Sequence, residues 1–336
     1  MTNLKKPGFS FRLRGMGRYL PERVMKSEEI DQKAGWAVGT TATKFRIKQR
    51  HYASDMETTT FMGAKALEEA LNEAGLKAGE LDLLISAAAS VEQPIPYQAS
   101  LLHRAIGLER SGIPCFDIDT TCLSFVTALQ VAAHFLQAGT YKRIAIVTSE
   151  IASIAINWEV PECFTLFGDG AACWILEADP TGEHGLFAHH LKTYSYGSAF
   201  CEMRAGATKF NMRRPPPSPN DYLFSMDGPE AFKLAVTYVH EFMGELMGKS
   251  GLSLKDIDLI APHQASPLAL HHMKTQLKIP DEKYVNYIAD YGNQVAASIP
   301  IALYRAREEG RWTPGKNLLL VGTSAGISLG GAILRL

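Results

Sequence analysis

Short apolar runs alternate with longer amphipathic stretches along the chain, and this alternation predicts a protein of mixed strands and helices. In the first half the pattern predicts strands at residues 8–20, 81–88, 114–118 and 143–149, and helices at 57–75, 98–107 and 123–138. The last of these helices is apolar nearly all round, with His134 as its one ionisable residue. A helix without a polar face has to be buried, so it is expected at the centre of a domain.

The same order of elements begins again in the second half. The pattern predicts a long helix at 228–250, a strand after residue 252, an apolar helix at 296–305 and a final strand from residue 318. Three matched pairs of positions, 76 with 252, 122 with 293 and 144 with 318, have offsets of 176, 171 and 174 residues. Nearly constant offsets indicate two copies of one βα unit. We therefore divide the chain into residues 1–180 and 181–336, with a boundary near 178–185.

Two copies of such a unit predict an α/β fold with a mixed, largely parallel sheet that helices cover. Ligands bind these sheets beyond the carboxyl ends of the strands, and a duplicated fold brings two such ends together. Cys122, His263 and Asn293 each lie just past a predicted strand or at a predicted helix start. We expect these three residues to share one site.

Three further stretches complete the pattern. Residues 27–50 are polar and predict irregular structure. Apolar residues at 164–167 and 171–176 predict two strands around a tight turn at Gly168-Asp169-Gly170. The stretch 204–220 contains four prolines and is expected to form a stiff surface loop.

Composition narrows the class of protein. The chain has 336 residues, enough for two domains or one large duplicated domain. A net charge of −1 argues against nucleic acid as a partner. The chain has no run of eighteen apolar residues, so no membrane span is expected. No apolar segment follows Lys5 and Lys6, so no secretory peptide is expected either.

Cysteine and histidine spacing excludes several kinds of site. Five cysteines without a CxxC pair argue against a disulfide framework or a zinc site, and for a reducing cytoplasm. The pairs His189-His190 and His271-His272 are adjacent, which does not suit a metal ion. No GxGxxG motif follows a strand, so a nicotinamide cofactor is not expected.

Cys122 lies between a predicted strand and the apolar helix. Free N–H groups and the helix dipole at a helix start lower a thiol pKa, which would suit a nucleophile. A cysteine among apolar residues can equally be a small core residue. His263 and Asn293 would supply a proton partner and an oxyanion donor, and the glycines between 322 and 331 would add N–H donors. Taken alone, His263 could be a core residue and Asn293 a helix N-cap.

Taken together, the motifs resemble the β-ketoacyl-[acyl carrier protein] synthase III branch of the thiolase superfamily. The resemblance rests on DxxxxCxxF at 117–125, GDGA at 168–171, PHQA at 262–265, YGNxxAAS at 291–298 and the glycine-rich loop near the C-terminus. It covers nearly the whole chain, and the combination and order of the motifs are far more specific than any one of them. It implies a thiolase-like, duplicated αβαβα fold with two mixed sheets around buried helices, and a homodimer.

The resemblance also implies a mechanism. Cys122 would accept an acyl group as a thioester, with its oxyanion held by the N–H groups of Cys122 and Ala325. His263 and Asn293 would promote decarboxylation of a malonyl thioester and stabilise the enolate, whose carbanion then attacks the acyl group. No cofactor is implied, because the departing carboxylate drives the condensation. The substrates would be acyl-CoA and malonyl thioesters, with an acyl carrier protein as an additional partner.

Several positions depart from the family pattern and concern the substrate. The resemblance implies substrate contacts from Trp36, Ile95, Gly228, Ser266 and Gly326. Ala325 stands where the family usually has Gly, Ser266 and Leu268 replace an Asn and an Arg, and Pro161 lies near the place of a second arginine that binds coenzyme A. Ile95 replaces the primer-pocket phenylalanine, which the family contributes across the dimer. Trp36 would stack on a coenzyme A base, or else be a buried loop anchor. These departures suggest a specialised relative rather than the enzyme that starts fatty acid synthesis.

Other functions remain open at this point. An acyltransferase that moves the acyl group to oxygen or nitrogen shares the scaffold, as does a branch that condenses two acyl thioesters and uses a Glu near the position of Ile95, for which Glu92 is a candidate. A non-catalytic partner subunit and a cysteine hydrolase are further alternatives. A basic cluster of Arg204, Lys209, Arg213 and Arg214 would suit an acidic carrier protein, or is a solvated face.

Overall fold

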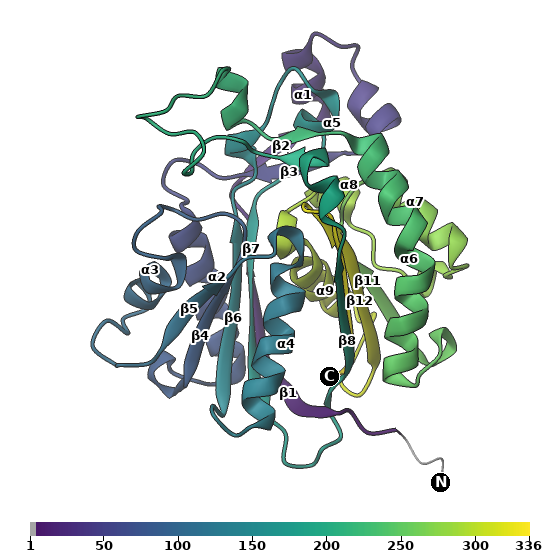
Figure 1. Cartoon of the computed structure of the whole chain (residues 1–336). Helices are drawn as coiled ribbons and strands as arrows, with labels where there is room; N and C mark the ends of the chain where they lie inside the picture. The colour runs from purple at the N-terminus through teal and green to yellow at the C-terminus, as the bar shows by residue number, and fades with distance from the viewer. Residues whose placement is uncertain (1–4) are drawn as a thin grey trace.

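Nine strands form one large sheet that is folded into two halves (Figure 1). The structure is a computed structural model that describes residues 5–336. Residues 1–4, the start of the segment in which no secretory peptide is expected, lie outside the described residues. The first half consists of β5 (Cys115–Ile118), β4 (Leu83–Ala87), β6 (Arg143–Glu150), β7 (Gly170–Ala178) and β1 (Phe9–Tyr19), in that spatial order. The second half continues with β8 (Gly185–Thr193), β13 (Ser328–Arg335), β12 (Asn317–Ser324) and β11 (Leu259–Pro262).

Helices lie outside and between the two halves of the sheet, which gives five layers (Figure 1). The helices are α1 (Ser27–Ala34), α2 (Thr59–Ala74), α3 (Gln98–Ala105), α4 (Ser124–Gln137), α5 (Pro161–Phe164), α6 (Gly228–Ser250), α7 (Pro267–Gln276), α8 (Ile288–Tyr291) and α9 (Ser298–Glu308). Helices α2 and α3 cover the first half, α6 covers the second with α7 beside it, and α4 and α9 pack between them. The predicted αβαβα fold is confirmed.

The two halves of the sheet are not fully separate. The start of β1 pairs with β8 through Phe9 with Leu186 and Ser10 with Gly185, and this short ladder joins them at one edge. The expectation of a largely parallel sheet was wrong. Only β5–β4–β6 and β11–β12 are parallel, because β7 and β13 return antiparallel beside β6 and β12 without a long crossover helix.

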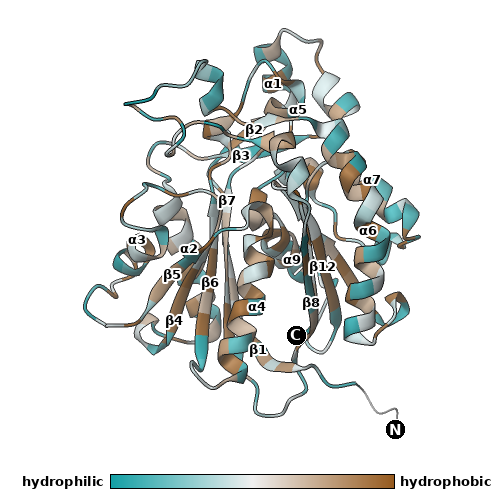
Figure 2. Ribbon diagram, viewed as in Figure 1, coloured by the Kyte–Doolittle hydropathy of each residue, from teal (hydrophilic) through white to brown (hydrophobic). Residues whose placement is uncertain are grey.

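The central helix α4 is buried as predicted. Figure 2 shows its largely apolar surface between the two halves of the sheet. Phe125 packs edge-on against Trp174 of β7, with ring centroids 5.0 Å apart, and both side chains are essentially inaccessible to solvent. Burying such side chains contributes about 1.5–3 kcal/mol each. The nucleophile candidate therefore precedes one of the most firmly packed helices of the fold.

Two local predictions were wrong. Residues 27–50 are not irregular: they form α1, a single turn of π-helix at Thr41–Phe45 and β3 (Gln49–Tyr52), which pairs with β2 (Arg23–Lys26). The buried Asp31 organises the segment by accepting hydrogen bonds from Gly39 and Thr41. Residues 164–167 are not a strand, because the short helix α5 extends to Phe164 and a turn follows it at 165–166. Short apolar runs do not distinguish the two structures.

The structure corrects the register of the repeat. Helices α4 and α9 begin at Ser124 and Ser298, 174 residues apart. Each follows a 3₁₀ turn, Thr121–Leu123 and Val295–Ala297, whose first residue has a positive φ, 50° and 49°. With this offset Cys122 corresponds to Ala296, and Asn293 to Asp119. The offset of 171 that matched Cys122 with Asn293 was therefore wrong.

Close contact between β1 and α2 leads to a stability prediction. A Cβ at Gly17 would lie 2.0 Å from the Ala66 carbonyl oxygen, a backbone atom that cannot move aside as a flexible side chain could. We expect Gly17→Ala to lower the free energy of unfolding by about 1–3 kcal/mol, because the core is overpacked. Urea denaturation would measure this. Gly79→Ala is the control, since a Cβ there meets no atom within 4 Å, and an equal loss in both variants would contradict the prediction.

The helices of the described residues were also compared with the length and hydropathy that a membrane span needs. None of those between residues 5 and 336 is both long and apolar enough to cross a bilayer.

Candidate active site

Cys122 lies in a sharp turn between β5 and α4. Thr121 adopts a left-handed conformation, and its N–H donates to Asp119 Oδ1 at 2.7 Å. The Ser124 hydroxyl accepts from the Thr120 N–H at 2.9 Å and donates to the Thr121 carbonyl at 2.7 Å. These local hydrogen bonds hold the backbone around Cys122 at the start of the buried helix.

His263 follows β11 directly. Its N–H donates to the Val321 carbonyl of β12 at 2.8 Å, and its Nδ1 lies 2.7 Å from the Ser298 hydroxyl at the start of α9. Ser298 Oγ also accepts the Gln264 N–H at 3.4 Å, so we assign its own proton to His263 Nδ1. With that tautomer Nε2 carries the ring proton and is a hydrogen-bond donor.

Asn293 precedes the second turn. Its Oδ1 accepts the Val295 N–H at 2.9 Å, and its Nδ2 donates to the Ala265 carbonyl at 3.2 Å. Its backbone is held from both sides, since its N–H donates to the Leu166 carbonyl and its carbonyl accepts the Gly168 N–H. An amide nitrogen has two protons, so one Nδ2 proton remains for a ligand.

The structure brings the three residues to one end of the sheet. Asn293 bonds to the loop that directly follows His263, and the turns that contain Cys122 and Ala296 pack against each other. The N–H of Ala325, just past β12, points to the Cys122 sulfur together with the N–H of Cys122 itself. Two backbone donors therefore face the sulfur, and two side chains that can donate lie at the same end of the sheet.

The thiol is not activated in the way that its position in the sequence suggested. Burial raises the pKa of Cys122 to about 12, and the charge of Glu150 acts in the same direction. The N–H groups of Cys122 and Ala325 lower this pKa but do not compensate for the burial. The helix start therefore does not bring the pKa of Cys122 below its usual value, contrary to expectation, and the resting nucleophile is a thiol. Burial also lowers the pKa of His263 to about 4, so this imidazole is neutral at pH 7.

The Ser298–His263 hydrogen bond leads to a second prediction. If the site decarboxylates a malonyl thioester, as the resemblance implies, we expect Ser298→Ala to lower the rate of that step about ten- to a hundredfold, because the imidazole loses its tautomer and orientation. Acylation of Cys122 should change little, which intact-protein mass spectrometry would show. Ser298→Thr keeps the hydroxyl and is the matched variant. An equal loss of both steps in Ser298→Ala would contradict the role of Ser298.

Two family models match this chain. One, described as 3-Oxoacyl-[acyl-carrier-protein (ACP)] synthase III, matches residues 116–195, and its C-terminal counterpart matches residues 247–336. The β-ketoacyl-[acyl-carrier-protein] synthase III of Aquifex aeolicus is 32% identical over 321 residues, which cover 96% of this chain and 98% of the relative. The chain belongs to the β-ketoacyl-[acyl-carrier-protein] synthase III family. It is therefore an acyl-transferring enzyme.

Other members of the synthase III family agree with this assignment. The enzyme of that name from Coxiella burnetii is 31% identical and covers 97% of this chain and 99% of its own length. The crystal structure of the synthase III from Aquifex aeolicus VF5 superposes with a TM-score of 0.87 at 30% identity, covering 97% of this chain and 100% of that one. The Pseudomonas aeruginosa PAO1 structure gives the same TM-score at 28% identity, covering 97% of this chain and 98% of its own.

Three of the residues expected to contact the substrate, Trp36, Ser266 and Gly228, are involved in local structure. Trp36 stacks on Phe45 with ring centroids 5.5 Å apart and packs at an angle on Phe164. Protein side chains already cover much of this indole, as they would for a loop anchor. Ser266 caps α7 by accepting the Ala269 N–H. Gly228 begins α6. Their contacts with a substrate stay predictions.

Gly326 and Ala325 lie in the short connection between β12 and β13. Gly326 has a φ of 131°, a conformation that favours glycine, and a Cβ there would meet only Ser328 Oγ, at 3.8 Å. The Ala325 side chain does not prevent its N–H from facing Cys122. Replacement of the usual glycine by Ala325 thus leaves the proposed oxyanion hole intact.

Ile95 and Glu92 belong to the loop between β4 and α3. The Ile95 side chain is 85% exposed, which would suit a residue contributed to another subunit. The Glu92 carboxylate is already engaged within the chain, because it accepts a hydrogen bond of 3.1 Å from the Thr60 N–H at the start of α2. The geometry therefore disfavours Glu92 as the acid of a branch that condenses two acyl thioesters.

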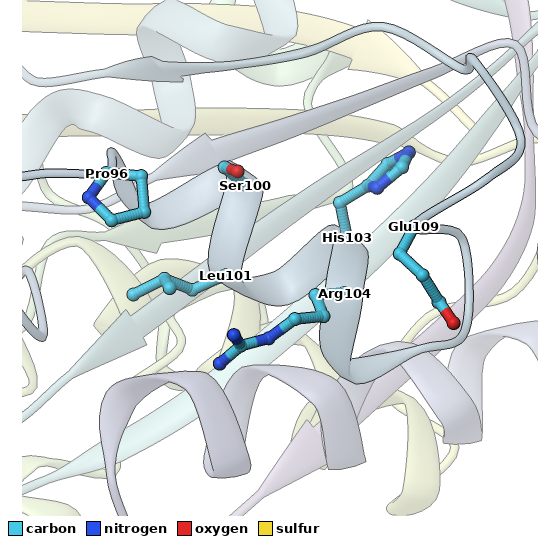
Figure 3. Close-up of a pocket in the computed structure, with 6 residues that line it drawn as sticks. All are labelled: Pro96, Ser100, Leu101, His103, Arg104 and Glu109. Carbon is cyan, nitrogen blue, oxygen red and sulfur yellow. The ribbon is translucent and has the colours of Figure 1, made fainter.

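Two surface hollows lie away from the predicted site. One, of about 220 Å³, is on α3 and is lined by Pro96, Ser100, Leu101, His103, Arg104 and Glu109 (Figure 3). A larger one, of about 650 Å³, lies beside α7 and α8. None of the predicted site residues lines either hollow, so we assign neither of them to the acyl chain.

No group of three His, Cys, Asp or Glu between residues 5 and 336 is placed to hold a metal ion.

Sequence reasoning missed two residues of the site. Ser298 was seen only as part of YGNxxAAS, yet it orients His263. Glu150 ends the apolar strand β6 and is completely buried, yet its charge acts on Cys122. A glutamate that directly follows an apolar run was the available signal, because such a residue is rarely buried without a reason.

Proposed function

We propose that the protein is a decarboxylating β-ketoacyl synthase. The arrangement around Cys122 supports this best: two backbone N–H groups face its sulfur, while His263 and Asn293 each retain an N–H for a ligand. A papain-like hydrolase would use the asparagine to orient the histidine, but here Ser298 does so and Asn293 bonds to the Ala265 carbonyl instead. The two backbone N–H groups therefore suit the carbonyl of an acyl thioester, and the two side-chain donors suit the carbonyl of a second thioester.

The first half-reaction transfers the acyl group. The Cys122 sulfur attacks the thioester carbonyl, and the resulting oxyanion accepts hydrogen bonds from the N–H groups of Cys122 and Ala325. The proton of the Cys122 thiol passes to the leaving thiolate, which departs as a thiol. Because the thiol pKa is high, the proton must be transferred as the new bond forms. The product is an acyl-Cys122 thioester.

The second half-reaction forms the carbon–carbon bond. The malonyl thioester loses carbon dioxide, and the enolate oxygen accepts hydrogen bonds from His263 Nε2 and Asn293 Nδ2. The carbanion attacks the acyl-Cys122 carbonyl, and collapse of the oxyanion releases a 3-oxoacyl thioester and the Cys122 thiolate. The thiolate takes a proton from water, which restores the thiol. We propose that the reaction needs no cofactor, because loss of the carboxylate drives it.

The test follows carbon dioxide and product together. An acyl-CoA donor and a malonyl thioester should yield equal amounts of carbon dioxide and 3-oxoacyl thioester. Acylated Cys122 without carbon dioxide release, with the acyl group passing to an alcohol or amine, would instead support the acyltransferase. Failure of every donor in a panel of acyl thioesters to acylate Cys122 would support a non-catalytic subunit.

We also propose that a carrier protein docks near residues 203–224, the surface excursion between β9 (Cys201–Glu202) and β10 (Ser225–Met226). Arg204 of the predicted basic cluster is paired with Asp221. Lys209, Arg213 and Arg214 are exposed and form no ion pair among the described residues. If they hold an acidic carrier protein, Arg213→Glu should slow turnover with carrier-bound malonyl and leave turnover with malonyl-CoA unchanged.

The edge of the sheet supports the proposal of a homodimer. Within residues 5–336 no strand pairs with the outer edge of β5, whose four residues are half-buried. Val91, Ile95 and Tyr97 are exposed apolar side chains in the loop before α3. An open strand beside exposed apolar groups favours pairing with a second copy.

The five cysteines are all unpaired, which supports the proposed cytoplasmic location.

A further inference from the structure

Glu150 is a buried carboxyl group at the point where the two halves of the chain meet. It is the last residue of β6 and has no exposed surface. Oε1 accepts the Ala89 N–H at 2.9 Å, and Oε2 accepts the Ser90 N–H at 2.9 Å. Both donors follow β4 and lead into the loop that contains Ile95. One side chain thus holds this loop against the neighbouring strand.

The same carboxyl group reaches the second half of the chain. Oε1 also accepts the Ala296 N–H, with a longer distance of 3.4 Å. Ala296 corresponds to Cys122 in the repeat, so its N–H is the counterpart of a donor that we assign to the oxyanion hole. In the second copy, this donor is already occupied by Glu150. The turn that contains Ala296 also includes Val295, whose N–H orients Asn293.

Glu150 also acts on the nucleophile through its charge. The side chains whose charges raise the pKa of Cys122 are Glu150 and Cys201. Burial raises the pKa of Glu150 itself to about 7, and that of Cys201 to about 11. The residues that bond to the carboxyl group, Ala89, Ser90 and Ala296, do not titrate, and His263 stays neutral above its pKa of about 4. Glu150 is therefore the group near Cys122 whose charge changes close to neutral pH.

We propose that Glu150 is a positioning residue of the condensation reaction, which joins the loop after β4 to the turn before α9 and whose charged carboxylate disfavours the Cys122 thiolate further than burial alone. This inference rests on the proposed function for its catalytic consequence. Its effect on the thiol does not require that any substrate be processed, so the two can be tested apart.

The experiment compares the wild type with Glu150→Gln, which keeps the shape and removes the charge. Alkylation of Cys122 by iodoacetamide is followed between pH 6 and 8.5 by mass spectrometry of the peptide that contains this residue. At pH 8.5 the variant should react roughly three- to tenfold faster, because one unit of thiol pKa changes the thiolate fraction tenfold. At pH 6 the difference should disappear, because Glu150 of the wild type is then protonated.

A purely structural role would give a different pattern. A loosened site would change the alkylation rate by a similar factor at both pH values. Equal rates in the variant and the wild type at both pH values, or a constant ratio between them, would overturn the proposal. Glu92→Gln is the matched control, since Glu92 likewise accepts a backbone N–H but does not act on Cys122. Its alkylation profile should coincide with that of the wild type.

A second variant keeps the proposal falsifiable if Glu150→Gln folds poorly. Glu150→Asp retains the charge on a shorter side chain. It should keep the pH profile of the wild type and yet lower kcat for condensation roughly tenfold, because its carboxylate no longer reaches both halves. Condensation at the wild-type rate in Glu150→Asp would overturn the positioning role. Absence of acyl-Cys122 in the wild type would overturn the proposed function instead and leave the alkylation result standing.

Discussion

Replacing Cys122 with alanine should abolish formation of the acyl-enzyme and lower the condensation rate by at least about 10³-fold, since the variant lacks the sulfur that forms the thioester intermediate. Decarboxylation of a malonyl thioester should persist, because His263 and Asn293 do not depend on the sulfur. Intact-protein mass spectrometry after incubation with an acyl-CoA would detect the missing adduct, and carbon dioxide release would report on the step that remains.

Cys201→Ala is the informative control for this experiment. Cys201 is the thiol whose charge acts on Cys122, and it retains partial solvent contact. It would be the first alternative site for an acyl group. We expect Cys201→Ala to be acylated normally and to condense. An acyl adduct on Cys122→Ala, located on Cys201 by peptide mapping, would show that the nucleophile has been assigned to the wrong cysteine.

Removing either enolate donor should give the opposite pattern. In His263→Ala and in Asn293→Ala we expect decarboxylation to fall about 10²–10³-fold, the usual cost of losing one preorganised donor. Acylation of Cys122 should continue, because the N–H groups of Cys122 and Ala325 hold that oxyanion. The measurements are carbon dioxide release at saturating malonyl thioester and single-turnover acylation.

The two donors should not contribute independently. Both bond to the same enolate oxygen, so the double variant should lose less than the product of the single losses. His271→Ala is the control, since His271 is exposed on α7 and away from Cys122. If His263→Ala lost acylation and kept decarboxylation, the imidazole would be the base of the first half-reaction and the assigned tautomer would be wrong.

The two sets of variants separate the half-reactions. Loss of the sulfur removes the acyl acceptor and spares the enolate, while loss of the imidazole or amide does the reverse. An acyltransferase would show no decarboxylation in the wild type, and hence no effect of Asn293→Ala on that step. The comparison therefore tests the proposed reaction class as well as the individual residues.

Much of the fold could be predicted from sequence because its elements are long and strongly periodic. The 23-residue helix α6 was predicted with its observed bounds, and the buried α4 with an error of one residue at each end. Short segments were less predictable. The apolar run at 164–167 is too short to distinguish a helix from a strand. The segment around α1 is held by Asp31, whose hydrogen-bond partners Gly39 and Thr41 come later in the chain.

By itself, the sequence determined which residue types follow which strands, and hence that Cys122, His263 and Asn293 belong to one end of a duplicated fold. Tertiary structure decided their chemistry. Burial, which no local pattern reports, outweighs the helix start and raises the pKa of Cys122. The tautomer of His263 depends on Ser298, 35 residues away, and Glu150 bonds to Ala296 across 146 residues. Electrostatic environment and hydrogen-bond partners arise from segments distant in sequence, so only the packed structure defines them.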